Sequence, residues 1–337
     1  MEIRQGTAVL WRGPGVVQVG SDPDHHFVLD GLSPAEQTWI LSAARSHPDL
    51  GPPPGRTASP RSPQASRWEA PTPAAARVAA RMRLDPSGTG PAPRTHGSRP
   101  SVRIDGIDAI TTAAARLLAR SGVSRMDVVD PRHVDDALLS TFAVDDLGAP
   151  RVQALAGDLE RLGRVRVAPL GVPDVVVLSR LRVPDWGTAS MLGVENRVHL
   201  LVTHHETAVE VGPLVVPGRT ACSQCRALHL TDADPHWPMT AREIPAWPVP
   251  PPDAALETVA ALEIARAVLG ITGHSDLGPT PLVGTGSDIV LRVEAGGRMR
   301  RVANPPHPRC PCGAADQAVS TGASTSSPRT RARTTTP

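Results

Sequence analysis

The 337-residue sequence contains no lysine and no tyrosine, and it has only two phenylalanines. Its 35 strongly basic residues are therefore all arginines. Without lysine, no ammonium side chain is available to clamp a phosphate or to form a Schiff base, which excludes lysine-based catalysis of either kind. Because aromatic rings are so few, the core must be aliphatic. Alanine, glycine, proline and arginine are abundant instead, a composition that indicates a GC-rich bacterial genome.

The sequence also has no run of 18 apolar residues, so it predicts no transmembrane helix. Its first residues, M-E-I-R-Q-G, include an early acid and no apolar stretch, which is unlike a signal peptide. We therefore expect a cytoplasmic protein with no membrane partner. A formal net charge of +2 argues against a dedicated nucleic-acid-binding protein. The absence of G-x-S-x-G, Walker A and H-E-x-x-H motifs argues against hydrolase and metalloprotease chemistry.

Proline and glycine punctuate the chain, with 37 and 29 copies respectively. This content indicates a globular centre with long proline-rich connections. We expect a small N-terminal domain over 1–46, a linker rich in Pro, Gly, Ser and Arg over 47–100, a large domain over 101–318 and a disordered tail over 319–337. One Ala/Arg segment inside the linker, 73–84, has the composition of a helix.

The N-terminal domain is predicted to hold strands followed by a helix. Residues 7–30 alternate apolar and polar positions around two turns, which is typical of a small antiparallel meander. Ser33-Pro34-Ala35-Glu36 places Ser at the N-cap, Pro in the first turn and Glu three residues on, so a helix should run to about Arg45. Such a unit fits a winged helix used on DNA, a peptide-docking sheet edge or a small packing appendage, and the sequence leaves all three open.

The large domain opens with a βαβ unit over 102–130. The strand V-R-I-D-G leads into an alanine-rich helix, and M-D-V-V-D forms a second strand that ends at Asp130. In a dinucleotide-binding unit the first turn carries G-x-G-x-x-G, whereas here the turn over 105–110 contains only Gly106. Asp130 stands where such a unit holds a ribose hydroxyl, although a solvated Asp at a strand end fits equally well.

Further strands and helices alternate after this unit, which favours a mostly parallel, Rossmann-like sheet covered on both faces. The expected strands are 165–170, 174–179 and 198–203, and the expected helices are 145–162, 183–195 and 253–269. We also expect a hairpin-like pair over 207–216, a long loop over 235–252 and a closing hairpin around Gly296-Gly297. His204-His205-Glu206 is predicted as an exposed loop, because adjacent histidines on a strand point to opposite faces and make no metal motif.

Four cysteines form two close pairs, Cys222-x2-Cys225 and Cys310-x-Cys312. In a chain without an export signal, such pairs are typical of metal ligands rather than disulfides. Four thiolates suit a tetrahedral ion, and zinc is the usual occupant of a closed, structural site of this kind. Two alternatives remain open: His307 in place of one thiolate, and disulfides or buried thiols without a metal.

The order of these parts resembles the ThiF/MoeB/E1-like family. The resemblance rests on the βαβ unit, the step L-G-A-P-R over 147–151, the segment V-G-P-L-V-V-P-G-x-x-x-C-x-x-C and the late C-x-C, and it covers 101–313, with 1–45 more loosely. It implies an α/β adenylation fold with a structural zinc that uses ATP and Mg²⁺ to adenylate the C-terminal carboxylate of a peptide or small protein, usually as a homodimer. The chain looks most like actinobacterial ThiF-type proteins, similar to the E1-like partners of peptide cyclodehydratases, which carry an N-terminal peptide-recognition domain.

The resemblance is incomplete at the nucleotide site. By analogy with the family, Gly106 would lie in the phosphate turn, Asp130 would hold the ribose, and Arg151 would replace a phosphate-binding lysine. The turn around Gly106 carries acidic side chains, which would repel ATP. Where the family has an Asn, an Arg finger and a Mg²⁺-binding Asp, this sequence has Leu138, Thr141 and either Ser179 or Arg180. No cysteine is left for catalysis once four bind the metal.

We therefore consider a degenerate E1-like protein that keeps the scaffold and binds a peptide or small protein partner, with catalysis weak or lost. The alternative is an active ATP-dependent adenylyltransferase of a protein or peptide carboxylate. A winged-helix DNA-binding regulator is a third hypothesis, which is less favoured because Arg4, Arg12 and Arg45 are few and scattered.

Overall fold

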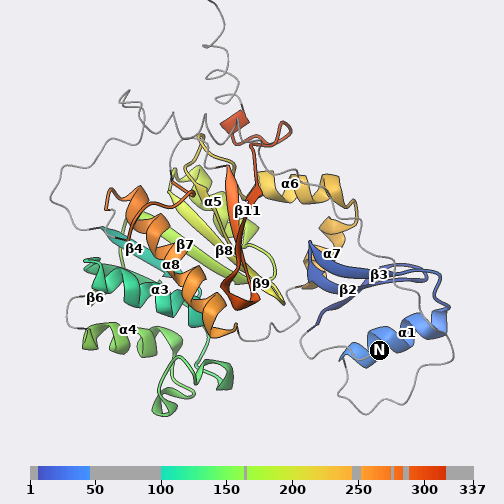
Figure 1. Cartoon of the computed structure of the whole chain (residues 1–337), viewed down its shortest axis with the longest axis horizontal. Helices are drawn as coiled ribbons and strands as arrows, with labels where there is room; N and C mark the ends of the chain where they lie inside the picture. The colour runs from blue at the N-terminus through green and yellow to red at the C-terminus, as the bar shows by residue number, and fades with distance from the viewer. Residues whose placement is uncertain are drawn as a thin grey trace, which may run out of the picture.

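The structure is a computed structural model that describes residues 7–45, 100–162, 165–244, 252–274, 277–283 and 288–315. The expected linker (apart from Pro100), the helical segment inside it and the expected tail lie outside these residues. The described chain forms a small sheet with one helix and a large sheet with helices on both faces (Figure 1).

The small unit is an antiparallel sheet packed on a helix. Its elements are β1 (Val9–Gly13), β2 (Val16–Asp22), β3 (His25–Leu29) and α1 (Pro34–Arg45), with the strands in the order β1-β2-β3. The predicted meander and helix are thus confirmed. Glu36 accepts hydrogen bonds from the backbone N–H and the hydroxyl of Ser33, at 2.8 and 2.6 Å, which fixes the start of α1. The winged-helix interpretation stays a prediction.

The large sheet has eight strands in the order β11-β10-β9-β8-β7-β4-β5-β6. Their bounds are β4 (Ser101–Asp105), β5 (Arg125–Val129), β6 (Arg166–Val167), β7 (Val175–Leu181), β8 (His199–His204), β9 (Ala208–Val215), β10 (Ile289–Glu294) and β11 (Met299–Ala303). β4 to β8 run parallel, and β9 to β11 extend the sheet in antiparallel pairs. The direction in which the chain fills the sheet reverses between β4 and β7, which is where open α/β sheets bind ligands.

Helices cover both faces of the large sheet (Figure 1). Their bounds are α3 (Ala109–Arg120), α4 (Arg151–Arg161), α5 (Trp186–Val194), α6 (Ser223–Ala233), α7 (Trp237–Glu243) and α8 (Ala254–Ile271). α3, α4 and α8 share an aliphatic core with one face of the strands, which includes Ile104, Leu118 and Ile264. α5 packs Ala189 and Leu192 on the opposite face. Among the described helices, none has the length and apolar character needed to span a membrane.

Two elements of the large unit differ from the sequence-based expectation. Residues 207–216 form the single strand β9 instead of a hairpin, because Gly212-Pro213 is accommodated as a bulge opposite β8 rather than as a turn. The helix expected over 145–162 begins only at Arg151, because Pro150 cannot donate to the helical ladder and stands at its N-cap.

The loop expected over 235–252 is also partly wrong, because α7 lies within it. Pro238 stands in the first turn of α7, where a proline costs no hydrogen bond, so its presence did not exclude a helix. The rest of that loop, 245–251, lies outside the described residues. The expected helix over 253–269 and the closing hairpin are confirmed as α8 and as the pair β10 and β11.

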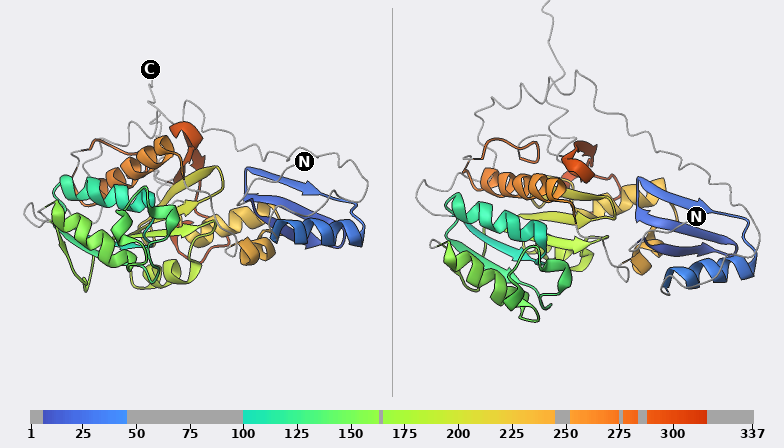
Figure 2. Two further views of the ribbon diagram at one scale, coloured as in Figure 1. Left: turned by 90° about the horizontal axis from the view of Figure 1, so that it is seen from below. Right: turned by 60° about the horizontal axis from the view of Figure 1, so that its bottom comes forward.

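The small unit lies beside the large sheet, next to α6 and α7 (Figure 2). Ala8 and Leu10 of the small unit share an apolar cluster with Val183, Trp237 and Ile244 of the large one. This cluster gives the two units a continuous apolar contact.

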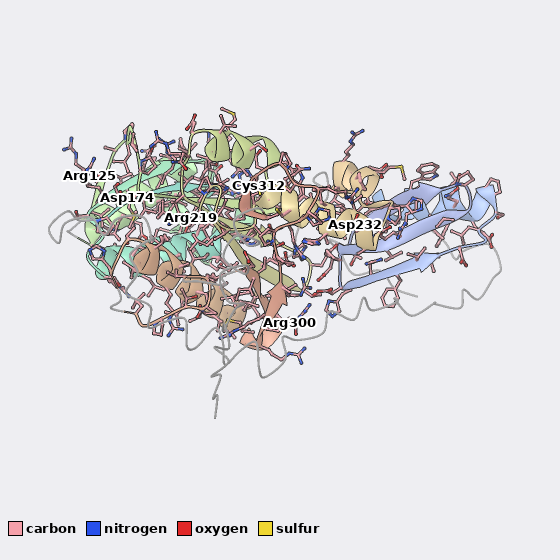
Figure 3. The ribbon with its side chains drawn as sticks, turned by 90° about the horizontal axis from the view of Figure 1, so that it is seen from above. Arg125, Asp174, Arg219, Asp232, Arg300 and Cys312 are labelled. Carbon is pink, nitrogen blue, oxygen red and sulfur yellow. The ribbon has the colours of Figure 1, made fainter. Side chains whose placement is uncertain are left out.

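A buried ion-pair network reinforces this contact. Arg292 on β10 is fully buried and forms an ion pair with Asp22 at the end of β2. Its guanidinium also lies 3.6 Å from Glu210 and 3.6 Å from Asp24. Arg300, which Figure 3 labels on β11, forms a further ion pair with Asp24. A charge as deeply buried as that of Arg292 is tolerated only when it is paired, so the network favours one fixed arrangement of the two units.

Candidate functional site

A cavity of about 450 Å³ opens at the carboxyl ends of β4, β5 and β7, where the chain order reverses. It is lined by Asp105, Gly106, Asp108, Asp130, Pro131, Arg132, Ser179, Arg180, Leu181, Val183, Pro184 and Asp185. Of the three nucleotide-site residues proposed from the sequence, Gly106 and Asp130 line the cavity. Arg151 does not line it and instead donates to the carbonyl of Ile107.

Gly106 forms the turn between β4 and α3 and contacts the neighbouring strand β7. Its φ of +99° lies in the left-handed region, and a Cβ at this position would lie 2.2 Å from the carbonyl oxygen of Ser179. Its own N–H donates to the carbonyl of Val129 at 2.9 Å. The turn is thus packed directly on the backbone of β7, and internal packing alone requires a glycine here.

Asp130 follows β5, and both of its carboxylate oxygens have partners from the chain. Oδ2 accepts from the Ile107 N–H at 2.7 Å and from Arg132 Nη2 at 2.6 Å, and Oδ1 accepts from the Arg132 N–H and Nε at 2.9 Å each. Burial by itself raises the pKa of Asp130, but these hydrogen bonds outweigh it and hold the pKa below its usual range. A ribose hydroxyl would have to take the place of Arg132.

Asp108 caps α3 and is the most constrained acid of the cavity. Its Oδ1 accepts from the Thr111 N–H at 2.9 Å, and the Thr111 hydroxyl oxygen accepts from the Asp108 N–H at 3.0 Å, which completes a capping box. Its Oδ2 accepts from the Ser179 hydroxyl at 2.6 Å and lies 3.2 Å from His204 Nε2. Burial raises the pKa of Asp108, but the His204 ring and these hydrogen bonds lower it well below its usual range.

The group formed by Asp108, Ser179 and His204 is not a nucleophile triad. His204 Nε2 lies 2.9 Å from the Ser179 oxygen and also faces Asp108, so one ring nitrogen meets both partners. In a serine nucleophile triad the two partners contact different ring nitrogens. The arrangement instead resembles an anion site at a helix N-terminus, with the chain's own carboxylate in the place of the anion.

Arg180 lines the cavity and is paired with two carboxylates of the same lining. Its Nη2 lies 2.8 Å from the Asp105 carboxylate and 3.1 Å from that of Asp185, and its Nη1 donates to two backbone carbonyls. Asp185 also caps α5 through the Thr188 N–H at 3.0 Å. The lining thus contains four carboxylates and two guanidinium groups, and both guanidinium groups are paired with these carboxylates. Such a lining disfavours a polyanion.

Arg151, at the start of α4, is buried and fixes the loop after β5. It donates to the carbonyls of Ile107 and His133 at 2.8 and 2.9 Å and forms an ion pair with Asp135 at 2.8 Å. Its guanidinium lies 4.0 Å from Asp130. Arg151 therefore joins the β4–α3 turn to the loop over 131–135.

The four cysteines form a second candidate site. Cys222 stands at the N-cap of α6 and Cys225 in its first turn, while Cys310 and Cys312 follow β11. Figure 3 labels Cys312 beside the start of α6. The four Sγ atoms lie within 4.8 Å of one another, and no disulfide joins them.

The spacing of the sulfur atoms fits a tetrahedral metal. Cys222 lies 3.9 Å from Cys225 and 3.6 Å from Cys310, and Cys225 lies 3.7 Å from Cys312. A zinc ion with Zn–S bonds of about 2.3 Å requires sulfur atoms about 3.8 Å apart. The set is thus suited to a metal ion, and a closed set of four ligands would tie the chain after β11 to α6.

His307 supports this site from outside. Its Nε2 lies 2.9 Å from Asp232 on α6, its Nδ1 accepts from the Arg309 N–H at 3.1 Å, and its carbonyl accepts from the Cys310 N–H at 2.9 Å. Both ring nitrogens are engaged away from the sulfur atoms. His307 therefore positions the turn that presents Cys310.

The expectation of an exposed loop at His204-His205-Glu206 is wrong. His204 and His205 are both 5% exposed, and Glu206 accepts from the Ser21 N–H at 2.8 Å. The small unit covers this end of β8, which no local pattern reveals. The two histidines do diverge as expected: His204 faces Asp108, and His205 Nε2 lies 3.9 Å from Glu210.

Sequence reasoning missed three polar residues of the cavity region, Arg132, Asp185 and His204. Each follows or ends near a strand of the parallel sheet, and ligand sites gather at the carboxyl ends of such strands. The position of these residues at the carboxyl ends of strands could have indicated them as site candidates, but it does not predict which of their side chains contact one another.

Comparisons with known proteins support the fold. No protein-family model matches the sequence, and no curated protein matches it. Among solved structures, the chain is similar to E. coli MccB with AMPCPP and MccA, at 18% identity and a TM-score of 0.51 over 64% of this chain and 66% of MccB. The fold is similar to that of MccB. A structure of E. coli MccB with MccA-N7isoASN gives 17% identity and a TM-score of 0.50 over 64% of this chain and 67% of MccB.

The likeness to MccB concerns the fold alone, because the identity is low. In another MccB structure, which contains succinimide, the match covers 66% of the length of MccB. The mixed α/β architecture expected from the E1-like resemblance is confirmed at this level, with the parallel strands β4 to β8 adjacent in one sheet.

Proposed function

We propose that this protein is a degenerate E1-like scaffold that binds a peptide or small protein partner and has weak or no adenylation activity. The observation that carries the proposal is the position of Asp108. Its carboxylate takes up the Thr111 N–H at the start of α3, together with the Ser179 hydroxyl and the His204 ring. A nucleotide phosphate would need this helix N-terminus and would meet a carboxylate there.

The rest of the cavity supports the same proposal. Asp130, the candidate ribose ligand, is paired with Arg132, and Arg180 is paired with Asp105 and Asp185. No cationic group of the described cavity lining is left without a carboxylate partner to meet a phosphate. ATP would have to break several charge-assisted hydrogen bonds to enter.

Peptide binding is supported by the small unit. β3 pairs with β2 alone among the described residues, which leaves one strand edge for an added peptide strand. Phe27 on β3 is 46% exposed and Trp11 on β1 is 38% exposed, and the strand register places both on the face of Val17 and Val19, where they stay partly exposed although α1 packs on this face. E. coli MccB has been solved with the peptide MccA, which supports a peptide partner on this fold.

We also propose that Cys222, Cys225, Cys310 and Cys312 hold a structural zinc ion, and that the protein is a homodimer. Zinc is favoured because four thiolates form a closed set with no open position for substrate. Elemental analysis of the purified protein should give one zinc per chain, and light scattering should give the mass of two chains.

The test of the proposed function is direct. Purified protein titrated with ATP and Mg²⁺ in a calorimeter should give no binding heat, and ATP–pyrophosphate exchange should stay at background. Exchange above background, with or without a bound peptide, would overturn the degenerate assignment. It would favour the alternative, an active adenylyltransferase in which Asp130 exchanges Arg132 for the ribose.

Peptide binding needs a separate test. A random peptide library displayed on mRNA is selected against the purified protein, and the enriched peptides are measured against Phe27→Asp and against Val144→Asp. Val144 is 72% exposed in the large unit, so it is a matched surface control. We expect the Phe27 variant to lose binding and the Val144 variant to keep it. A library without enriched peptides, or equal binding to both variants, contradicts docking on the small sheet.

A further inference from the structure

One residue of the cavity wall is turned away from the cavity. Ser179, Arg180, Leu181, Val183, Pro184 and Asp185 all line it, whereas Arg182, in the middle of this run, does not. Arg182 has a φ of +68°, which an L-residue rarely adopts, and its side chain is fully buried. Such a conformation persists only where the surroundings hold it, so the contacts of Arg182 matter.

Those contacts lead to the small unit. The Arg182 guanidinium forms an ion pair with Glu206 and donates to the Ser21 hydroxyl on β2 at 2.6 Å. Glu206 in turn accepts from the Ser21 N–H and from its hydroxyl, at 2.8 Å each. The Arg182 N–H donates to the His204 carbonyl at 2.6 Å. Arg182 therefore connects β2 of the small unit, the end of β8 and the cavity wall.

The neighbouring residue adds an apolar contact of the same kind. Val183 lines the cavity and also packs in the cluster that contains Ala8 and Leu10 of the small unit. Residues 182 and 183 thus rest on the small unit through a buried hydrogen bond to Ser21, which Glu206 also holds, and through apolar packing. The strap, defined as residues 181–185, forms one side of the cavity and is supported by the small unit.

We infer that Arg182 is a positioning residue that couples the small sheet to the cavity, so that a change at Ser21 alters the strap. The inference rests on the proposed function in one respect, namely that a partner docks on the small sheet. β2 pairs with β3 on both sides of Ser21, at Val19 and at Asp22, and Ser21 lies in the register shift between them, so a peptide added at β3 acts on the strand that carries Ser21. The cavity is then regulated by occupancy of the small unit.

Hydrogen–deuterium exchange of the full-length protein tests this coupling without any ligand. The first variant is Ser21→Ala, which removes the hydroxyl that accepts from Arg182 and donates to Glu206. The second is Arg182→Lys, which keeps the positive charge but loses the planar guanidinium with its several N–H donors. We expect amide exchange in the strap to rise about fivefold in Ser21→Ala, because one buried hydrogen bond that holds its closed state is lost. Arg182→Lys should show a smaller increase in the same segment, because its ammonium keeps the ion pair with Glu206.

The matched control is Arg300→Gln, which breaks another ion pair between the units, with Asp24, but touches no residue of the strap. It should leave exchange in the strap unchanged. The inference is overturned if Ser21→Ala leaves the strap within twofold of the wild type, if Arg300→Gln accelerates the strap equally, or if Ser21→Ala accelerates the core helix α8 as much as the strap. Because no peptide or nucleotide is added, these outcomes are separate from the tests of the proposed function.

Discussion

Replacing Asp108 by asparagine tests the central claim about the cavity, that an internal carboxylate excludes phosphate. Asparagine has nearly the same shape and caps a helix as well as aspartate does, so α3 should keep its start. The Thr111 N–H at 2.9 Å then donates to a neutral amide oxygen, and the amide nitrogen takes the place of Oδ2, so the Ser179 hydroxyl, 2.6 Å away, must accept instead of donating. We expect a loss of about 1–3 kcal/mol of stability, the usual difference for hydrogen bonds to a charged group.

The gain in anion affinity follows from Coulomb's law. A phosphate at the start of α3 would lie roughly 4 Å from the Asp108 carboxylate, where the repulsion is about 4 kcal/mol at an effective dielectric constant near 20. The Asp108 side chain is 17% exposed and the cavity is open to salt solution, so we take about one third of this value. The remaining ~1.4 kcal/mol corresponds to about tenfold tighter binding of an anion.

Calorimetric titration with inorganic pyrophosphate measures this gain. The control is Asp185→Asn, which removes a second carboxylate from the same cavity but caps α5 rather than α3. We expect about tenfold tighter binding for Asp108→Asn and a smaller change for the control. Equal affinities of wild type and Asp108→Asn, or an equal gain in both variants, would refute the assignment of Asp108 to the anion position.

Further predictions concern the metal site, the contact between the units and pH. Cys225→Ser should lose most of the bound metal in elemental analysis, and chelation of the wild type should lower its melting temperature, since a structural zinc contributes on the order of 10 kcal/mol. Arg292→Met should cost about 3–5 kcal/mol in urea unfolding, because buried Asp22 loses its guanidinium partner and keeps only the exposed His25 ring, 3.5 Å away, as a cation. The half-exposed Arg300→Met should cost at most about 1 kcal/mol. Burial raises the pKa values of Asp22 and Glu210, but nearby cations lower them by more, so both pKa values lie below their usual range. The two carboxylates therefore stabilise the fold above about pH 4, and this stabilisation is lost as the pH falls. The melting temperature should decline below that pH.

The sequence predicted those features whose signals are local. Ser33 and Glu36 form the predicted cap of α1, and the short spacing within each cysteine pair predicts the cluster that the fold brings together. The predictions for β9 and α7 were wrong because a proline that usually ends a strand or helix is tolerated at these positions. Gly212-Pro213 lies within the hairpin-like pair expected over 207–216, but the sheet accommodates it in a bulge. Pro238 lies within the expected loop over 235–252, but it stands in the first turn of α7, where a proline costs no hydrogen bond.

The polar contacts of the cavity were out of reach of the sequence for a different reason. His204 meets Asp108 only because β7 and β8 are neighbours and the end of β8 turns back under the small unit. Arg182 was likewise invisible, because its partner Ser21 belongs to another unit. Such contacts depend on the strand order and on packing between units, and residue spacing carries no information on either.

The turn after β4 has a consequence for attempts to build a glycine-rich phosphate loop into this chain. Counted from Gly106, the second and third glycines of G-x-G-x-x-G fall on Asp108 and Thr111, the two residues that form the capping box of α3. Glycine at 108 would cost only about a few tenths of a kcal/mol as an N-cap, but it would remove the capping box, and glycine at 111 would place a flexible residue in the first helical turn at a cost of about 1 kcal/mol. It would also leave the Ser179 hydroxyl without its carboxylate. In this chain the helix start and a glycine-rich phosphate loop compete for the same two positions, so a variant with both glycines would need a compensating stabilisation elsewhere.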